Sequence, residues 1–193
     1  MKKILLFFLL NIFLINKSFA LIEIDITRGN LDPLPIAISP LHVDIKSENS
    51  DDLKIKELGE NISKIIENNF RGTGLFNPLK KDAFVQKPDI AHLKPRFEDW
   101  KLITAQALVT GKLLVKDGKL KVEFRLWDVA ASKEMIALAF TTTPSNWRRV
   151  AHIISDKIYE RLTGESGYFD TRVIYVSETG PKTQRVKKLA IMD

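Results

Sequence analysis

Histidine is the residue type in this sequence best suited to bind a metal ion or to move protons near neutral pH. The sequence contains His42, His92 and His152, and none stands four residues from another beside a glutamate, the spacing by which one helix holds zinc. No cysteine occurs in these 193 residues, which excludes disulfides, thiolate metal sites and thiol catalysis within them. We interpret His152 as a solvated or edge histidine on the flank of an expected helix. No metal site is predicted.

Two short glycine-containing stretches superficially resemble catalytic motifs. Gly164-Glu165-Ser166-Gly167 is similar to a nucleophile elbow, but its second glycine comes one residue early, and the stretch follows a helix where the motif requires strand, turn and helix. Gly72-Thr73-Gly74 follows a helix and lacks the Lys-Ser/Thr of a phosphate loop, so we interpret it as a helix end. Glu98-Asp99 and the pair Glu57 and Glu60 are typical of solvated helix faces. We expect no catalytic residue, no cofactor and no small-molecule substrate.

The first twenty residues have the pattern of an export signal. Lys2 and Lys3 precede an apolar run, and Ser18-Phe19-Ala20 supplies the small residues that a signal peptidase requires, so we expect cleavage between Ala20 and Leu21. The apolar run is shorter than the roughly 20 residues of a membrane-spanning helix. Removing the three lysines of this leader leaves 27 basic and 24 acidic residues, a net charge of +3. Such a mild charge does not by itself indicate nucleic acid or anionic lipid as a partner.

The segment that follows the leader alternates between apolar and polar residues. Ile22, Ile24 and Ile26 fall on one side of residues 21–27 and their polar neighbours on the other, which predicts a strand. Such a strand either completes the sheet of its own domain or pairs with the sheet edge of a partner protein. The pattern alone fits both interpretations equally.

The remaining elements follow from hydrophobic periodicity. We expect strands at 36–43, 105–115, 120–129 and 135–141, with Pro40 interrupting the first and Lys116-Asp117-Gly118 joining the second to the third as a hairpin. Helices are expected at 51–69 and 147–163, the latter capped by Ser145, and one or two helical turns at 96–104. Residues 75–79 are expected to form a loop with Phe76 buried, and residues 80–95 a surface coil.

This order of elements predicts an α+β, two-layer domain in which a mixed sheet carries the helices on one face. The domain is expected to close at residue 164. Residues 165–170 then read as a hinge-like link, and 171–193 as the start of a second unit, with two strands at 171–177 and 185–192. Two strands alone are marginally stable in water, so we expect this part to need further chain or a partner.

Several stretches together resemble the TolB family of the periplasmic Tol–Pal system. They are Ile22-Glu23-Ile24-Asp25-Ile26-Thr27-Arg28-Gly29, Pro35-Ile36-Ala37-Ile38, Gly74-Leu75-Phe76-Asn77-Pro78-Leu79, Val109-Thr110-Gly111, Leu126-Trp127-Asp128, Arg148 to Thr163, Leu162 to Val176, and Leu189-Ala190-Ile191-Met192-Asp193. The most specific is the stretch from Leu162 to Val176, and the resemblance covers essentially the whole chain.

The resemblance implies an α/β domain at 35–164 followed by a β-propeller, of which 171–193 would be the first two strands. It implies a non-enzymatic periplasmic scaffold that binds the inner-membrane protein TolA and the lipoprotein Pal and acts in envelope integrity and cell division. The family's TolA-binding element maps onto residues 21–34. The residues expected to bind TolA are Leu21, Ile22, Glu23, Ile24, Asp25, Ile26, Thr27, Arg28 and Gly29. The segment is also expected to be sequestered on the body of the protein when Pal occupies the propeller.

The family carries its Pal site on the propeller, so we expect TolA capture rather than Pal binding from the residues present. We interpret the short propeller portion as a split or decayed gene product or a fragment, which would leave a single-domain periplasmic binding module. Two other classes remain as alternatives. A nucleic-acid-binding domain is suggested by the likeness of this element order to some anticodon-binding domains, against which the export signal, the mild charge and the lack of a basic–aromatic platform argue. The other is a hydrolase without its catalytic half.

Overall fold

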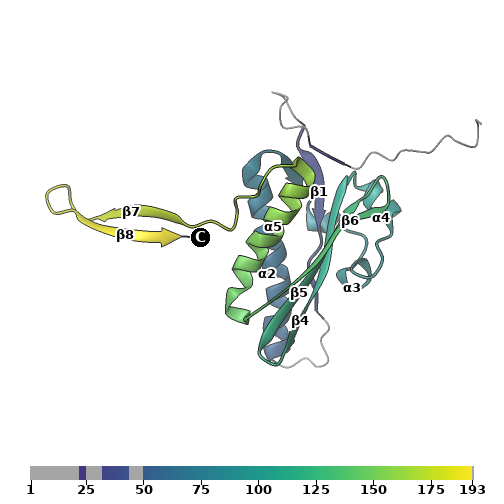
Figure 1. Cartoon of the computed structure of the whole chain (residues 1–193), viewed down its shortest axis with the longest axis horizontal. Helices are drawn as coiled ribbons and strands as arrows, with labels where there is room; N and C mark the ends of the chain where they lie inside the picture. Colours follow the sequence, from purple (N-terminus) through teal and green to yellow (C-terminus); the bar gives the residue numbers. More distant parts are fainter. Residues whose placement is uncertain (1–21, 25–31, 44–49, 193) are drawn as a thin grey trace, which may run out of the picture.

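A mixed sheet forms the centre of the computed structural model, which describes residues 22–24, 32–43 and 50–192 (Figure 1). The expected signal peptide at 1–20 and its cleavage point at Leu21 lie outside the described residues. The sheet contains β1 (Leu34–Ile38), β2 (His42–Val43), β3 (Phe76–Pro78), β4 (Ala107–Lys116), β5 (Lys119–Asp128) and β6 (Lys133–Thr142). Its order is β3-β1-β4-β5-β6, and β2 also pairs with β4. β1 runs parallel to β3 and β4, whereas β4, β5 and β6 are antiparallel.

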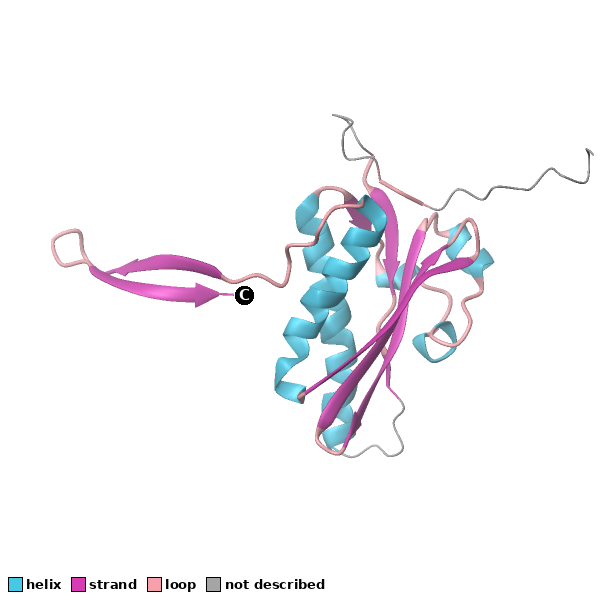
Figure 2. Cartoon of the chain, viewed as in Figure 1, coloured by secondary structure: helices cyan, strands magenta, loops and turns pink. Residues whose placement is uncertain are grey.

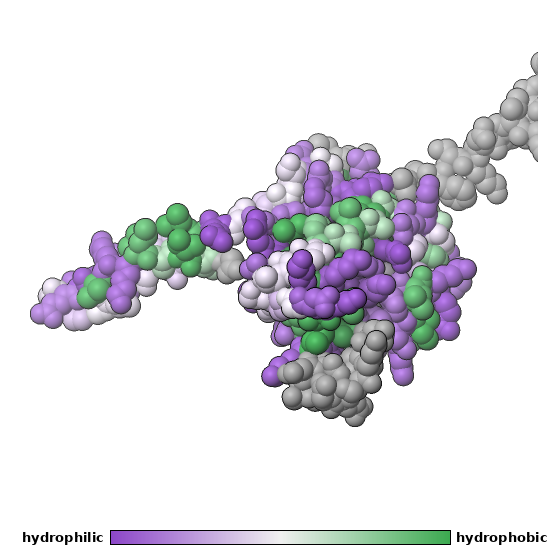
Figure 3. Space-filling view, turned by 60° about the horizontal axis from the view of Figure 1, so that its bottom comes forward, coloured by the Kyte–Doolittle hydropathy of each residue, from purple (hydrophilic) through white to green (hydrophobic). Residues whose placement is uncertain are grey.

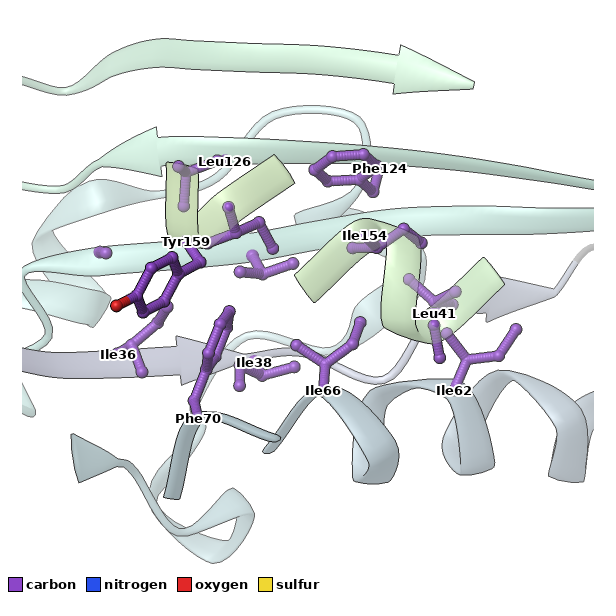
Figure 4. Close-up of a cluster of buried hydrophobic side chains, with 14 of the residues drawn as sticks. Ile36, Ile38, Leu41, Ile62, Ile66, Phe70, Phe124, Leu126, Ile154 and Tyr159 are labelled. Carbon is purple, nitrogen blue, oxygen red and sulfur yellow. The ribbon is translucent and has the colours of Figure 1, made fainter. Parts of the chain in front are cut away.

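Two long helices, α2 (Ser50–Thr73) and α5 (Trp147–Thr163), cover one face of the sheet (Figure 2). Their apolar stripes meet the inward side chains of β1, β4 and β5 in one core, part of which is drawn in Figure 4. Each large apolar side chain that is fully buried there contributes about 1.5–3 kcal/mol. The fully buried members from the two helices are Ile62, Ile66, Phe70, Ala151, Ile154, Ile158 and Leu162. The expected α+β class and its mixed sheet are confirmed.

The opposite face is partly covered as well, contrary to the expectation that helices pack on one face only. Two short helices, α3 (Pro88–Ala91) and α4 (Phe97–Leu102), lie there and bury Trp100 against Ala37 and Leu108. The side chain of Gln86 fixes this layer, because its Oε1 accepts hydrogen bonds from Trp100 Nε1 at 3.0 Å and from the Arg96 amide at 2.9 Å. β1 and the start of β4 are apolar on both faces, as expected of parallel strands that are covered on both sides.

Several local predictions were wrong. The expected loop at 75–79 contains strand β3, although Phe76 is buried as predicted. The expected coil at 80–95 contains α3 and a 3₁₀ turn at Lys81–Ala83. The expected strand at 36–43 is divided into β1 and β2 around Pro40.

The expected cap of α5 was also wrong. Residues Pro144–Asn146 form a 3₁₀ turn before the helix, and Asn146 occupies the cap position without a side-chain hydrogen bond. The hydroxyl of Ser145 instead lies 3.0 Å from that of Thr143. Proline has a fixed φ that suits the first position of a helical turn, so the turn begins at Pro144 and Ser145 falls inside it.

The residues that follow α5 are held against the helix before the chain departs. Asp156 accepts the amides of Phe169 at 2.7 Å and Asp170 at 3.1 Å through its two carboxylate oxygens. The ring of Phe169 lies edge-on to Phe70 and Tyr159, at centroid distances of 5.9 and 5.8 Å. The expected link at 165–170 is thus anchored along α5 rather than detached from it.

A hairpin of β7 (Val173–Thr179) and β8 (Val186–Met192) then projects from the α/β body (Figure 1). Figure 3 shows apolar surface on this hairpin as green patches. Its exposed apolar side chains include Val173, Ile174, Val176, Leu189 and Ile191. The two strands have the expected antiparallel pairing, and all their side chains are exposed except those of Ser177 and Ala190, which are partly buried.

Candidate functional site

The leading segment Ile22–Ile24 rests in a seat on the α/β body formed by the end of β5 and the end of α5. Two hydrogen bonds donated by its main-chain amides hold it there. The Ile22 amide donates to Asp128 Oδ2 at 3.2 Å, and the Ile24 amide donates to the Leu162 carbonyl at 2.7 Å. Both acceptors belong to residues far along the chain, so the segment is positioned by tertiary structure and not by its neighbours in sequence.

Asp128 contributes the first acceptor from the last position of β5. The burial of β5 alternates strictly, so Asp128 falls on the inward side after Leu126 and is only 1% exposed. Its Oδ1 accepts the Ala131 amide at 2.8 Å and so closes the turn between β5 and β6. A carboxylate removed from water needs hydrogen-bond donors, and Oδ2 receives one from the leading segment. Asp128 therefore serves both the turn and the seat.

The second acceptor is a carbonyl at the C-terminal end of α5. The last carbonyls of a helix have no partner within the helix, so the Leu162 carbonyl is open to an outside donor. Gly164 ends α5 with φ of +76°, a left-handed conformation that glycine adopts without strain, and its amide returns to the Glu160 carbonyl at 2.9 Å. This sharp end turns the following residues away and leaves the Leu162 carbonyl for Ile24.

The side chains of the segment alternate as the sequence indicates. Ile22 and Ile24 are half-buried against the core, whereas Glu23 is exposed. Beside Glu23 is an open hollow of about 340 Å³, whose other lining residues are Ile136, Lys157, Glu160, Arg161 and Gly164. Lys157 Nζ lies 2.8 Å from Glu160 Oε2, and this hydrogen bond raises the pKa of Lys157 above its ordinary value. The seat thus has an apolar floor and a charged rim.

Of the residues expected to bind a partner, the structure describes Ile22, Glu23 and Ile24. The others lie outside the described residues; they are Leu21, Asp25, Ile26, Thr27, Arg28 and Gly29, together with Ala20 of the expected cleavage point. Ile22–Ile24 are not part of a strand, which corrects the expected strand at this point. The physical reason is that the Ile22 and Ile24 amides bond to a side-chain carboxylate and to a helix end. Neither acceptor is the main-chain carbonyl of a neighbouring strand, so no ladder of main-chain hydrogen bonds forms.

Sequence reasoning missed Asp128 and Leu162 as parts of the site. For Asp128 a signal was present, because an acidic residue continues the inward positions of an otherwise apolar alternation in β5. A carboxylate in such a position predicts nearby main-chain amides as partners. For Leu162 the sequence predicts the helix end but does not indicate which amide would bond to its carbonyl.

The three histidines lie in two separate places. His152 is 9% exposed between α2 and α5, where Asn69 Nδ2 lies 3.1 Å from its Nδ1, so the expectation of a solvated or edge residue was wrong. The rings of His42 and His92 stack at 4.3 Å on the other side of the molecule. Among the described residues, no group of three or more His, Cys, Asp or Glu side chains is placed to hold a metal ion.

The serine of the elbow-like motif and the residues of the two acidic pairs are exposed or paired with a neighbouring charge, as structural residues are. Ser166 is exposed after the end of α5, and Glu98 pairs with Lys101 at 2.9 Å on α4. Glu57 and Glu60 are exposed on α2. Within the described part of the chain, none of the helices has the length and apolar character needed to cross a membrane.

Comparison with known proteins identifies close relatives. A family model described as the TolB amino-terminal domain matches residues 22–135, and the match thus begins at the seated segment. The chain is 69% identical over 188 residues to the Tol-Pal system protein TolB of Pelagibacter ubique (strain HTCC1062). That alignment covers 96% of this chain but 42% of the relative, so the chain spans less than half of its relative's length.

A solved structure has the same fold. The crystal structure of TolB from Acinetobacter baumannii superposes with a TM-score of 0.65 at 23% identity, covering 84% of this chain and 37% of that one. This similarity concerns the arrangement of elements alone, because the identity is low.

Proposed function

The chain belongs to the TolB family, and from this premise we propose that it is a non-enzymatic periplasmic component of the Tol–Pal cell-envelope system. In this proposal residues 1–20 direct export and are removed, and residues 21–34 capture a TolA-like inner-membrane protein. The α/β domain at 35–164 carries that segment, and the link at 165–170 leads to residues 171–193, which open a propeller. In longer relatives the propeller would bind a Pal-like lipoprotein. The cellular role would be envelope integrity and outer-membrane invagination during division.

The observation that supports capture is the weak seating of Ile22–Ile24. The bond from the Ile22 amide to the Asp128 carboxylate and the bond from the Ile24 amide to the Leu162 carbonyl contribute about 2–4 kcal/mol together. Half-burial of two isoleucines adds about 2–3 kcal/mol. Ordering three backbone residues costs about 3–6 kcal/mol. The favourable free energies of bonding and burial nearly cancel the cost of ordering the backbone. The segment is therefore balanced between the seated and the released state.

Release would expose an alternating segment to a partner. The Ile22 and Ile24 amides and side chains would then be free to pair with the edge of a partner's sheet, where main-chain hydrogen bonds provide affinity and alternate side chains provide specificity. Micromolar binding corresponds to about 8 kcal/mol, which exceeds the stability of the seat. Seat and partner would compete for the same amides. The apparent affinity for the partner then equals the affinity of the released segment multiplied by the fraction of molecules in which the segment is released.

Titration calorimetry with the purified C-terminal domain of TolA tests capture. Deleting residues 21–31 is expected to abolish the heat of binding, because the paired segment is gone. Ile24→Ser is expected to weaken binding by about tenfold or more through loss of an apolar contact. Ile191→Ser makes the same change at an isoleucine of β8, outside the segment, and is the control for which unchanged binding is expected. Unchanged affinity after the deletion would refute the proposal.

A second variant tests the competition between seat and partner. Asp128→Asn keeps one oxygen for the Ala131 amide and replaces the acceptor of the Ile22 amide by an amino group. This change removes about 1 kcal/mol from the seat and is expected to strengthen TolA binding by up to about fivefold. Weaker binding by this variant, with an unchanged unfolding midpoint, would mean that seating assists capture and would contradict the competition.

A further inference from the structure

The face of the sheet opposite to α2 and α5 is open beyond α3 and α4. The outward side chains of β4, β5 and β6 lie on this face, next to the layer in which α3 and α4 bury Trp100. Strand β6 ends the sheet, and among residues 22–24, 32–43 and 50–192 no strand pairs with its outer edge. Ten residues of β6 therefore present an edge that could be extended.

The β6 edge lacks the protection that natural sheet edges carry. Exposed edges are blunted by charged side chains, prolines or bulges in their middle, which prevent pairing with other chains. In β6 the charged residues Lys133 and Glu134 and the register shift opposite Leu126/Trp127 are all at the start of the strand. From Met135 to Thr142 the strand has neither charge nor proline. An unprotected edge of this length is suited to receiving a strand.

A hollow of about 480 Å³ lies on the open face next to this edge. His92 and Leu93 form one side, and Ala137 to Ala139 of β6 form the other. Lys112, Glu123 and Arg125 line its floor. The register places Glu123 beside Ala139 and Arg125 beside Ala137. Because alanine side chains are short, the charged groups of β5 are accessible across β6 from its outer edge.

The open face is basic. Its charged strand residues are Lys112, Lys116, Lys119, Lys121, Glu123, Arg125 and Glu134, which give a net charge of +3. Glu123 is surrounded by Lys121 at 2.7 Å and Lys112 at 3.3 Å. Arg125 Nε reaches over β6 to Glu134 at 3.1 Å, so a guanidinium already extends toward the edge.

We propose that β6 is a docking edge, which receives an extended, acidic segment of a partner protein as an added strand. The main chain of the segment pairs with β6 between Ile136 and Thr141. Every second side chain of the segment lies on the open face beside Ala137, Ala139 and Thr141. A carboxylate there reaches Arg125, which pairs with Ala137, or Lys121, which pairs with Thr141. This edge adjoins the seat of Ile22–Ile24 at Ile136, which lines the hollow beside Glu23, but it receives a segment from the partner rather than supplying one.

Charge selects this occupant over a second copy of the chain. Pairing β6 with β6 of another copy would join the two sheets and place two faces of net charge +3 side by side, which like charges oppose. An acidic segment instead adds carboxylates to a face on which five basic side chains are balanced by two acidic ones.

The test uses the full chain and a synthetic peptide of alternating valine and glutamate as the probe. Hydrogen exchange is followed at the amides of Ile136 to Thr141, and binding is followed by fluorescence anisotropy of the labelled peptide. We expect the valine–glutamate peptide to slow hydrogen exchange at these β6 amides. The corresponding valine–lysine peptide is expected to leave their exchange rates unchanged. Binding without protection of β6 would overturn the proposal. The same peptide N-methylated along one edge is expected to lose binding, because it cannot form the main-chain ladder.

Matched variants assign the charge contacts. Lys112→Met with Lys121→Met keeps the apolar stems and is expected to weaken peptide binding by about tenfold, since charge-assisted hydrogen bonds are lost. Lys187→Met with Lys188→Met makes the same change on β8, where unchanged binding is expected. If both double variants lost the same fraction of their peptide affinity, the attraction would depend only on the overall charge of the protein, and the proposal would be overturned. It would also fail if oligothymidine bound the open face more tightly than the peptide, or if β6 became protected by self-association without peptide.

Discussion

At the scale of single residues, buried or paired carboxylates organise this protein. Asp128 joins the leading segment to the turn between β5 and β6, and Asp156 joins the link to α5. Each carboxylate accepts two main-chain amides from segments that have no regular structure. Charge-assisted hydrogen bonds of this kind are stronger than those between neutral groups, which explains how irregular segments are held in place.

Glu123 provides a test of pH dependence at this scale. The Lys121 ammonium donates a hydrogen bond that lowers the pKa of Glu123, with Lys112 acting in the same direction and partial burial opposing both. A folded-state pKa below the unfolded value means that Glu123 stabilises the fold above the unfolded pKa. This contribution is lost as pH falls through the folded pKa. We expect carbon NMR titration to report a pKa of Glu123 below the ordinary glutamate value.

Substitution of the two lysines separates their effects on that pKa. Lys121→Met is expected to raise the pKa of Glu123 toward its ordinary value. Lys112→Met is the matched control and is expected to raise it less, because Lys112 Nζ lies 3.3 Å from Glu123 compared with 2.7 Å for Lys121. A larger rise from Lys112→Met would show that the pairing in solution differs from the one described.

At the scale of elements, helix α2 depends on a glycine that helix propensity would disfavour. A Cβ on Gly59 would lie 2.7 Å from the Leu41 carbonyl oxygen and 3.2 Å from Leu113 Cδ2. Alanine would favour the helix by about 1 kcal/mol. The overlap would cost about 1–3 kcal/mol, because backbone cannot move aside easily. We therefore expect Gly59→Ala to lower the free energy of unfolding in urea denaturation, despite its better helix propensity.

Gly72 in the last turn of the same helix is the matched control. Beyond the neighbouring backbone of α2 itself, no atom lies within 4 Å of the position where its Cβ would be. Gly72→Ala is expected to raise the free energy of unfolding by up to about 1 kcal/mol. If both alanine variants were stabilised equally, the close approach between Leu41 and α2 would be disproved.

Elements with strong periodicity or turn chemistry were predictable from the sequence. Asp117 and Gly118 have φ of +52° and +70°, as the expected hairpin requires, and β4, β5, β6, α2 and α5 lie close to their expected ranges. The short elements β3 and α3 were missed because a few residues do not establish a period. The seat was missed because its hydrogen bond joins Ile22 to a residue 106 positions away. No local pattern encodes such a contact.

At the scale of the whole molecule, stability resides in the α/β body, and the β7–β8 hairpin is an appendage. The hairpin strands pair with each other, and their apolar side chains are largely exposed. A variant that ends at residue 171 is expected to keep its free energy of unfolding within about 0.5 kcal/mol, because no buried contact is removed. Urea denaturation followed by tryptophan fluorescence would measure this, since Trp100 is 1% exposed in the body.

A variant that ends at residue 164 is the control. It also removes Phe169 and the two amides bound by Asp156, and we expect a loss of about 2 kcal/mol. The shorter variant should also resist aggregation better than the full chain, because the exposed hairpin edges are absent. An equal loss of stability in both variants would mean that the hairpin, and not the link, supports the body.

Helix α5 holds both the segment Ile22–Ile24 and the residues through which the chain leaves the α/β body. The Leu162 carbonyl holds Ile24, while Asp156, six residues earlier on the same helix, holds the residues from which the chain departs toward β7. A tensile load applied to the leading residues therefore falls on the same stretch of helix that sets the direction of departure.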